Sequence, residues 1–504
     1  IYSSVFYRIK GFDFKSAHGD AKLQFTLFTL LLLRRMREVA VDDQKVLLVR
    51  IQGQYSAVGS RCSHYSAPLI KGALVGDRVR CPFHGACFNV RTGDIEEYPG
   101  LDSIPSYKVN HTTFVANCLL LFKNIYIKKV KIPGTKHTVL LIGGGPASLV
   151  CAETLRQNCY PGHIVIQQHP PPALCGYVLL QVVSVHPPDK VVKMSDGTSK
   201  RYDQLLIATG SRPLSCPGSD LKGVHLLQSY DDAKEIHSSS VGQRAVVIGA
   251  SFIGMEVASY LSDKATSVAL VGSASYPFEK SLGPEIGKMT MMLEEKNVKF
   301  FMNDRVTEIR GENGKVKNVV LSSGAVLEAD VVIAGIGVIP NSDFLAGSKV
   351  AVDSGKAVIV DKYMRTNIPD IFSAGDVASF PLSIRGDQQV NIGHWQMSHS
   401  HGKVAALNML KKPTKIESVP FFWSALAGKS IRYTGYGEGY TEILVKGKVE
   451  ERKFLAFYIK DEEVVAAASL MFDPAVAQVA ELMAEGKNIT KKQAQSDDLS
   501  WLQM

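Results

Sequence analysis

Hydrophobic positions follow two different patterns along the chain. Near the N-terminus, short runs alternate between apolar and polar residues or are continuously apolar, which predicts antiparallel strands separated by turns such as Gly53. These runs lie at residues 36–39, 45–50 and 54–58. Farther along, apolar runs alternate with helical segments, which indicates α/β units with buried parallel strands. The apolar runs lie at 138–142, 163–166, 244–248 and 267–271, and the helical segments at 149–157 and 255–261.

The hydrophobic pattern predicts different structures at the two ends of the chain. From Val419 on, the pattern predicts strands at 441–445, 453–458 and 464–469 and a helix at 474–484, so we expect an α+β domain there. The apolar run at 23–33 is shorter than the about 20 residues that a spanning helix needs, and we predict no transmembrane span. Because the chain begins at Ile1, we expect an incomplete N-terminus in which no targeting signal can be read.

Composition narrows the class of protein. A length of 504 residues predicts about three domains. The 8 cysteines are scattered without a C-x-x-C pair, which favours a reducing compartment over a disulfide framework. The net charge of +9 is spread along the chain, so we interpret it as a solvated surface and predict no specific nucleic-acid partner.

Two short boxes carry the candidate metal ligands. One residue separates Cys62 from His64, and two residues separate Cys81 from His84. A [2Fe–2S] cluster with two thiolates on one iron and two imidazoles on the other needs this interleaving, because each loop must reach both metals. A zinc site is the alternative, but zinc fingers usually group Cys with Cys and His with His. The order C-x-H…C-P-x-H-G therefore predicts a Rieske cluster.

The neighbours of these boxes suggest a low reduction potential. Ala86 and Phe88 occupy positions at which Rieske proteins of the cytochrome bc complexes have Ser and Tyr. Hydroxyl donors to the cluster stabilise its reduced state, so their absence predicts a lower potential. We interpret the adjacent Cys87 as a small core residue and not as a ligand.

A glycine-rich turn follows the predicted strand at 138–142. Gly143 supplies the tight turn, Gly145 lets backbone approach a pyrophosphate, and Ser148 is a small residue where a helix packs on the strand. The pyrophosphate would lie at the helix N-terminus, where amide groups and the dipole face it. The next strand ends in Gln167 and Gln168, not in the acidic residue expected at the ribose.

A second glycine turn repeats the pattern after the strand at 244–248. It contains Gly249, Ser251 and Gly254, with Ser251 in place of the middle glycine. The following strand ends near Gly272, so neither an acidic nor a basic residue distinguishes NAD from NADP.

Three further segments complete the order of an FAD fold with an inserted NAD(P) fold. One crossover segment contains Thr209 and Gly210, and its counterpart contains Gly337. A later Gly375-Asp376 pair is similar to a second FAD motif, in which Asp376 would bind the ribityl–phosphate arm.

These motifs resemble the pyridine nucleotide-disulfide/FAD-dependent oxidoreductases, and more closely the branch of apoptosis-inducing factors and oxygenase-coupled ferredoxin reductases. The segments around Trp395 and Trp423 resemble a helix beside the flavin and the start of the C-terminal domain in that branch. The histidines at 394, 399 and 401 would then line or solvate this helix and not bind metal. A Rieske domain fused to the reductase is the arrangement of the mitochondria-associated, Rieske-containing apoptosis-inducing factors.

The resemblance implies FAD, a [2Fe–2S] cluster and NAD(H) or NADP(H) as cofactors. It implies hydride transfer from NAD(P)H to FAD and single-electron steps to the cluster, with His64 or His84 facing an unidentified one-electron acceptor. Glu256 and Trp395 are the candidate catalytic-site residues, both in positioning roles. A homodimer and a mitochondrial or cytoplasmic location are further expectations.

The predicted fold class is multidomain: a small all-β Rieske domain, glutathione-reductase-like α/β FAD and NAD(P) domains, and an α+β C-terminal domain. The expected divisions are a poorly determined segment at 1–35, the Rieske domain at 36–127, a linker at 128–137, the FAD domain at 138–235 and 356–418, the NAD(P) domain at 236–355 and the C-terminal reductase or interface domain at 419–504.

One segment departs from the family. A helix of about 11 residues and a strand of about 5 do not fit between Gln168 and Gln181, so the FAD domain looks shortened there. The lost segment would carry the lysine that partners Glu256. An alternative function is therefore a redox-impaired interaction protein in cell-death signalling, and a third is the electron-supply component of a separate oxygenase.

Overall fold

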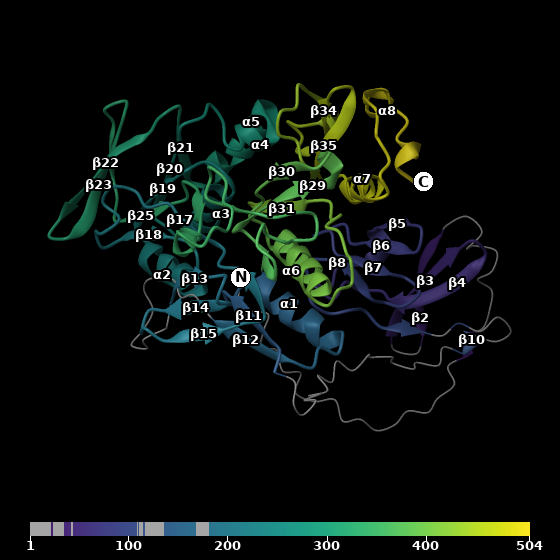
Figure 1. The fold of residues 1–504 in the computed structure, drawn as a ribbon. Helices are drawn as coiled ribbons and strands as arrows, with labels where there is room; N and C mark the ends of the chain where they lie inside the picture. Colours follow the sequence, from purple (N-terminus) through teal and green to yellow (C-terminus); the bar gives the residue numbers. More distant parts are fainter. Residues whose placement is uncertain are drawn as a thin grey trace.

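The computed structural model describes residues 22–23, 35–41, 44–107, 109, 114–115, 136–167 and 181–503. Most of the segment at 1–35, most of the linker at 128–137 and the shortened segment near 168–181 lie outside the described residues. Figure 1 shows the β-rich N-terminal part beside the C-terminal domain and the first α/β unit, with the second α/β unit on the opposite side of the molecule.

The N-terminal domain consists of two four-stranded antiparallel sheets, which confirms the predicted all-β domain. One sheet has the order β2 (Met36–Val41), β3 (Gln44–Ile51), β4 (Gln54–Gly59), β9 (Ser106–Tyr107). The other has the order β5 (Ala73–Val75), β6 (Arg78–Arg80), β7 (Cys87–Asn89), β8 (Ile95–Glu97). Leu47, Val58, Val79 and Phe88 meet in the core of this domain.

The first α/β unit is built on a parallel sheet. Its order is β12 (His163–Gln167), β11 (Thr138–Ile142), β16 (Gln204–Ile207), β28 (Ile371–Ser373). Val139 and Leu141 pack on one face against helices α1 (Pro146–Gln157) and α6 (Trp395–Met409). Leu140 and Ile142 pack on the other face against a meander of β13 (Val182–His186), β14 (Val191–Met194) and β15 (Ser199–Arg201).

The second α/β unit repeats this plan. Its parallel sheet has the order β18 (Val224–Leu226), β25 (Val331–Ala334), β19 (Arg244–Ile248), β20 (Ser267–Gly272), β21 (Val298–Met302). Helices α2 (Tyr230–Ser240) and α3 (Phe252–Leu261) accompany the sheet, and β22 (Val306–Glu312), β23 (Lys315–Leu321) and β24 (Val326–Glu328) form its meander. The strands β17 (Ser211–Pro213) and β26 (Val338–Pro340) pair where the chain passes between the units.

Two details differ from the expected ranges. Helix α1 begins at Pro146 and not at residue 149, because proline suits the first turn of a helix, where its missing N–H has no intrahelical acceptor. The strand β18 belongs to the second sheet although it precedes residue 235, and α2 crosses that residue. Leu345 and Val350, expected in the second unit, pack in the core of the first. The second unit therefore begins before residue 236 and ends before residue 345, and both boundaries lie nearer the N-terminus than the expected range 236–355.

The C-terminal domain is a five-stranded antiparallel sheet covered by α7 (Ala475–Ala484). The strand order is β31 (Phe421–Leu426), β32 (Lys429–Gly435), β35 (Glu463–Leu470), β34 (Lys453–Lys460), β33 (Glu442–Lys448). The last three strands and α7 match the prediction, whereas β31 and β32 were not predicted as strands. Helix α7 contacts β5 and β6, so the N-terminal domain is docked on this domain (Figure 1).

Candidate active site

Two loops of the N-terminal domain have the same backbone geometry. The N–H of Cys62 donates to Ala67 O at 2.9 Å, and the N–H of Cys81 donates to Ala86 O at 2.8 Å. Four residues after each cysteine, the N–H of Ser66 or Gly85 donates back to the cysteine carbonyl. Each loop thereby holds a cysteine and a histidine in a closed turn, with side chains that point to the same place.

The four predicted ligands lie together as two pairs. Cys62 and Cys81 are buried, and a hydrogen bond between their thiols lowers the pKa of Cys62. The rings of His64 and His84 are 5.0 Å apart. His64 Nδ1 is buried and has no hydrogen-bond partner among the residues that the structure describes. Two thiols therefore lie beside two imidazoles, and one buried ring nitrogen lacks a hydrogen-bond partner among the described residues. This set of donor atoms fits a [2Fe–2S] cluster.

The histidine edge of this site faces the C-terminal domain of the same chain. The His84 ring lies 4.2 Å from the indole of Trp423 on β31, and the His64 ring lies 6.0 Å from it. On β32, Arg432 Nε donates to Phe83 O at 3.3 Å, next to the predicted ligand His84. His84 is half-buried by its own chain, as is His64, and the expectation that His64 or His84 faces a separate acceptor stays a prediction.

The first glycine turn has the geometry of a phosphate site. Gly143 has φ +109°, and a Cβ there would lie 2.1 Å from Ala208 O, so only glycine fits. Gly145 caps α1, and a Cβ there would meet nothing within 4 Å, so the space beside it at the helix N-terminus is open. Ser148 is buried in the first turn of α1, as expected of a small packing residue.

Asp376 lies between α6 and the first crossover segment. Its carboxylate accepts hydrogen bonds from Ser398 Oγ at 3.2 Å and Ser211 Oγ at 3.4 Å, and burial raises its pKa. Gly375, at φ +80°, donates its N–H to His401 Nδ1 at 3.2 Å. This buried carboxylate with two long hydrogen bonds fits a hydroxyl-rich ligand such as the ribityl arm of FAD.

The other predicted residues of this unit have structural contacts. Thr209 Oγ1 donates to Asn341 O at 2.6 Å, and Gly210 O accepts from Asn341 N at 2.9 Å, so these two residues tie the crossover segments together. Trp395 begins α6, with its ring 5.4 Å from that of His399. His394, His399 and His401 do not solvate the helix: burial lowers the pKa of each to between about 3 and about 4.

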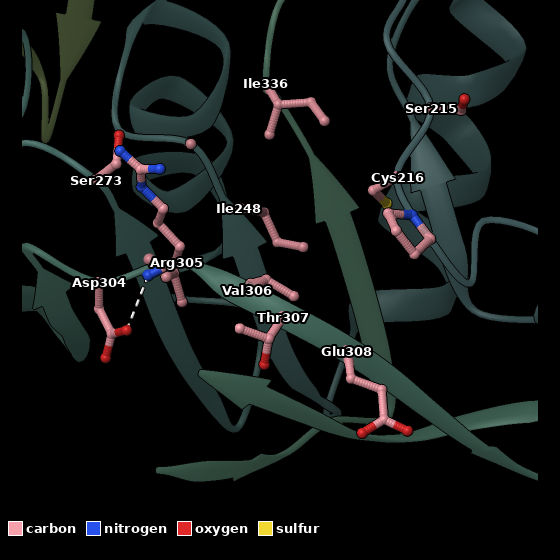
Figure 2. Close-up of a pocket in the computed structure, with 13 residues that line it drawn as sticks. Ser215, Cys216, Ile248, Ser273, Asp304, Arg305, Val306, Thr307, Glu308 and Ile336 are labelled. Carbon is pink, nitrogen blue, oxygen red and sulfur yellow. Dashed lines mark hydrogen bonds between the residues drawn. The ribbon is translucent and has the colours of Figure 1, made fainter. Parts of the chain in front are cut away.

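The second glycine turn borders a cavity of about 290 Å³ at the carboxyl ends of β19 and β20 (Figure 2). Gly249 has φ +107°, and a Cβ on Gly254 would lie 1.8 Å from Gly249 O, so helix and turn touch. Ser251 caps α3 without a side-chain hydrogen bond to the helix, and Gly337 has φ +118°. A cavity at this edge of a parallel sheet fits a dinucleotide.

Glu256 on α3 joins this unit to the C-terminal domain. Its carboxylate accepts a hydrogen bond from Ser424 Oγ at 2.8 Å, and burial raises the pKa of this carboxyl group. In the described part of the chain Ser424 is therefore a hydrogen-bond partner of Glu256, for which the sequence analysis expected a lysine. Neither Ser424 nor Arg432 received a role in the sequence analysis, because both lie on the two strands that were not predicted.

Three family profiles match the chain. They are described as Rieske [2Fe-2S] domain at residues 30–108, Pyridine nucleotide-disulphide oxidoreductase at 176–402 and Reductase C-terminal at 421–501. These matches agree with the predicted fold class and with the FAD, NAD(P) and [2Fe–2S] cofactors.

Known proteins resemble nearly the whole chain. The chain is 42% identical to Apoptosis-inducing factor 3 of Mus musculus, covering 93% of this chain and 86% of the mouse protein. It is 28% identical to Rhodocoxin reductase of Rhodococcus erythropolis, covering 72% and 92%. Among solved structures, the covalent putidaredoxin reductase–putidaredoxin complex matches with a TM-score of 0.67 and 25% identity, covering 72% of this chain and 96% of that chain.

Proposed function

Because this chain belongs to the apoptosis-inducing factor 3 family of Rieske-containing flavin oxidoreductases, we propose that it passes electrons from NAD(P)H through FAD to its own Rieske cluster. The observation that carries the proposal is the 4.2 Å contact between Trp423 and His84. It brings the reductase part and the cluster loop together within one polypeptide.

The site residues would have distinct tasks. FAD accepts electrons as a hydride and releases them singly, as a one-electron cluster requires. Gly143, Gly145 and Ser148 would hold its pyrophosphate at α1, and Asp376 would accept hydrogen bonds from its ribityl arm. Cys62, His64, Cys81 and His84 would hold the cluster. Gly249, Ser251 and Gly254 would hold the nicotinamide dinucleotide.

Three aromatic and acidic residues lie between these sites. Trp423 contacts His84 on one side, and its ring is 5.7 Å from His394, which caps α6, on the other. Trp395 begins the same helix. Glu256 accepts a hydrogen bond from Ser424, the residue that follows Trp423 in the chain. We assign Trp423 to the electron path and Trp395 and Glu256 to positioning the flavin and nicotinamide rings.

The test follows cluster reduction in the FAD- and iron-loaded protein after anaerobic mixing with reduced nicotinamide cofactor. Trp423→Leu should leave flavin bleaching unchanged and slow the appearance of the reduced-cluster EPR signal at least about tenfold, a barrier increase of about 1.4 kcal/mol. Trp501→Leu is the matched control, because Trp501 packs on Phe457, away from the cluster. Equal cluster reduction in wild type and Trp423→Leu would contradict the path.

A second candidate function is supported by the edge of the first sheet. In the described part of the chain β12 has a neighbour on one side only, and Ile166 is 46% exposed, as expected if covering elements were lost. The chain would then be a redox-impaired interaction protein in cell-death signalling, as the printed names of its relatives suggest. Purified protein with an intact cluster but without flavin absorbance would favour this candidate. Stoichiometric FAD would favour the reductase.

Three further expectations rest on the family alone. A one-electron acceptor would take electrons from the cluster, and a homodimer and a mitochondrial or cytoplasmic location follow from the resemblance. Among the described residues, no helix has the length and apolarity needed to cross a membrane.

A further inference from the structure

The nucleotide cavity of the second α/β unit lacks the carboxylate that reads an unmodified ribose. In NAD sites an acidic residue at the end of the second strand accepts hydrogen bonds from the ribose hydroxyls. Here β20 ends at Gly272, followed by Ser273, which lines the cavity. A Cβ on Gly272 would lie 2.7 Å from Ala250 Cβ and 2.9 Å from Met302 Cε. An acidic side chain therefore does not fit at this position unless its neighbours move.

Arg305 supplies a positive charge at the same end of the cavity. Figure 2 shows its guanidinium extending toward Ser273. The side chain is exposed, and its backbone N–H donates to Asp304 Oδ1 at 2.8 Å, which fixes the start of the loop. In the part of the chain that the structure describes, no carboxylate forms a salt bridge with this guanidinium. A planar guanidinium without a partner suits a phosphate.

The two acidic residues that line the cavity are engaged elsewhere. Asp304 accepts hydrogen bonds from Ser322 Oγ at 2.6 Å and Ser323 Oγ at 2.5 Å, and these hydroxyls hold its pKa well below the usual range. Glu308 lies at the opposite end of the cavity from Ser273 and pairs with Arg310 at 2.8 Å (Figure 2). Asp304 is therefore ionised, with its oxygens held by these serine hydroxyls, so at the end beside β20 the Arg305 guanidinium is the cation and the charges of the two residues balance.

We infer that the nicotinamide cofactor of this chain is NADPH, with Arg305 and Ser273 binding the 2′-phosphate of its adenosine ribose. This inference rests on the proposed function and names the cofactor that it uses. The phosphate would accept from the guanidinium and from the Ser273 hydroxyl. At Gly272 a carboxylate, which would repel the phosphate, fits only if Ala250 and Met302 move.

Calorimetric titration of the oxidised, FAD-loaded protein with NADP⁺ and with NAD⁺ tests the inference without turnover. Wild type should bind NADP⁺ at least about tenfold more tightly, as expected for one charge-assisted contact. Arg305→Gln should remove most of this difference and leave the Kd for NAD⁺ within about twofold. Ser273→Asp should weaken NADP⁺ binding by placing a carboxylate beside the phosphate. Lys317→Gln is the control: it removes the same charge from an exposed ion pair with Glu312, outside the cavity lining.

The possible outcomes separate the two proposals. Wild type that binds NAD⁺ as tightly as NADP⁺, or an Arg305→Gln variant that weakens both equally, would overturn the inference and leave the reductase function intact. Failure of the FAD-loaded protein to bind either nucleotide would overturn both. A loss of NADP⁺ preference in Arg305→Gln and not in Lys317→Gln would support the inference.

Discussion

A buried carboxylate in the flavin region is a source of instability as long as no ligand covers it. Asp376 has only two hydroxyl donors in the described part of the chain, and burial raises its pKa. A carboxyl whose folded pKa lies above its unfolded value contributes stability below the unfolded pKa and loses it as pH rises through the folded pKa. Ionised Asp376 therefore destabilises the flavin-free protein at neutral pH, which is a cost of keeping an acceptor for the cofactor.

The first prediction concerns Asp376→Asn. In flavin-free protein at pH 7 this variant should have a higher Tm than wild type. The gain should vanish as pH falls toward about 4, the pKa of Asp in unfolded chains. The affinity for FAD should fall about tenfold or more, because a hydrogen bond to a charged group is lost. Thermal scans and flavin titration measure both, with the exposed Asp220→Asn as control. A lower Tm together with unchanged FAD affinity would be the opposite result.

The neighbours of the cluster allow a second prediction at this scale. Ala86 is fully buried, and its carbonyl accepts from Cys81 N, so a hydroxyl at position 86 would lie next to the cysteine loop. Ala86→Ser should raise the midpoint potential by a few tens of millivolts, since about 59 mV corresponds to about 1.4 kcal/mol for one electron. Redox titration monitored by EPR measures the shift. Ala57→Ser, on β4 away from the ligand loops, is the control, and a shift of equal size there would refute the local explanation.

At the scale of elements, the strand β6 is attached to helix α7 by a buried ion network. Arg80 is fully buried, and it donates to Glu481 Oε1 at 2.5 Å, to Glu97 Oε2 at 2.8 Å and to Gly85 O at 3.0 Å. Arg78 adds a contact with Glu97 at 3.0 Å. The guanidinium of Arg80 thus joins Glu481 of the C-terminal domain to Gly85, in the loop that holds His84. Such a network specifies a single docking geometry, because a displaced partner leaves a buried charge unpaired.

The third prediction removes one member of this network. Glu481→Gln should lower the free energy of unfolding by about 3 kcal/mol, because the buried Arg80 guanidinium loses one of its two charged partners and keeps only Glu97. Chemical denaturation measures the change. Glu485→Gln, at the C-cap of the same helix, is the matched control, since Glu485 pairs at the surface with Lys487 and its loss should cost about 0–1 kcal/mol. Equal losses in the two variants would show that the burial of the pair contributes nothing.

Elements with a local signal could be predicted from the sequence, and the others could not. The strands β11 and β19 match their apolar runs because each run is bounded by a glycine turn. The strands β31 and β32 were missed although β31 carries Trp423. Their pattern is set by contacts with the N-terminal domain, such as Phe421 against Gly85, and not by alternation along the strand. Trp423 against His84 and Arg80 against Glu481 depend on domain docking, which no local pattern encodes.

At the scale of the whole molecule, the cluster is a fixed part of the reductase and not a diffusing carrier. Ala73 of β5 packs with Val419, Phe421 and Val476 of the C-terminal domain in one hydrophobic core. Together with the Arg80 network and the Arg432 contact to Phe83, this core attaches the N-terminal domain at several points around the ligand loops. Tyr65, 68% exposed, lies with its ring 4.6 Å from that of His64, so this side of the cluster site is open.

The last prediction follows from this attachment. The rate constant for cluster reduction after full reduction of FAD should be independent of protein concentration, because donor and acceptor belong to one docked chain. It should also vary little with salt, since buried ion pairs are screened much less than exposed ones. Stopped-flow measurements over a wide range of concentrations and ionic strengths test both points. Glu481→Gln, which weakens docking, should slow the intramolecular phase and introduce a concentration-dependent one. A wild-type rate proportional to concentration would show that the cluster is reduced by a second molecule, in which case the contact between Trp423 and His84 is not the electron path.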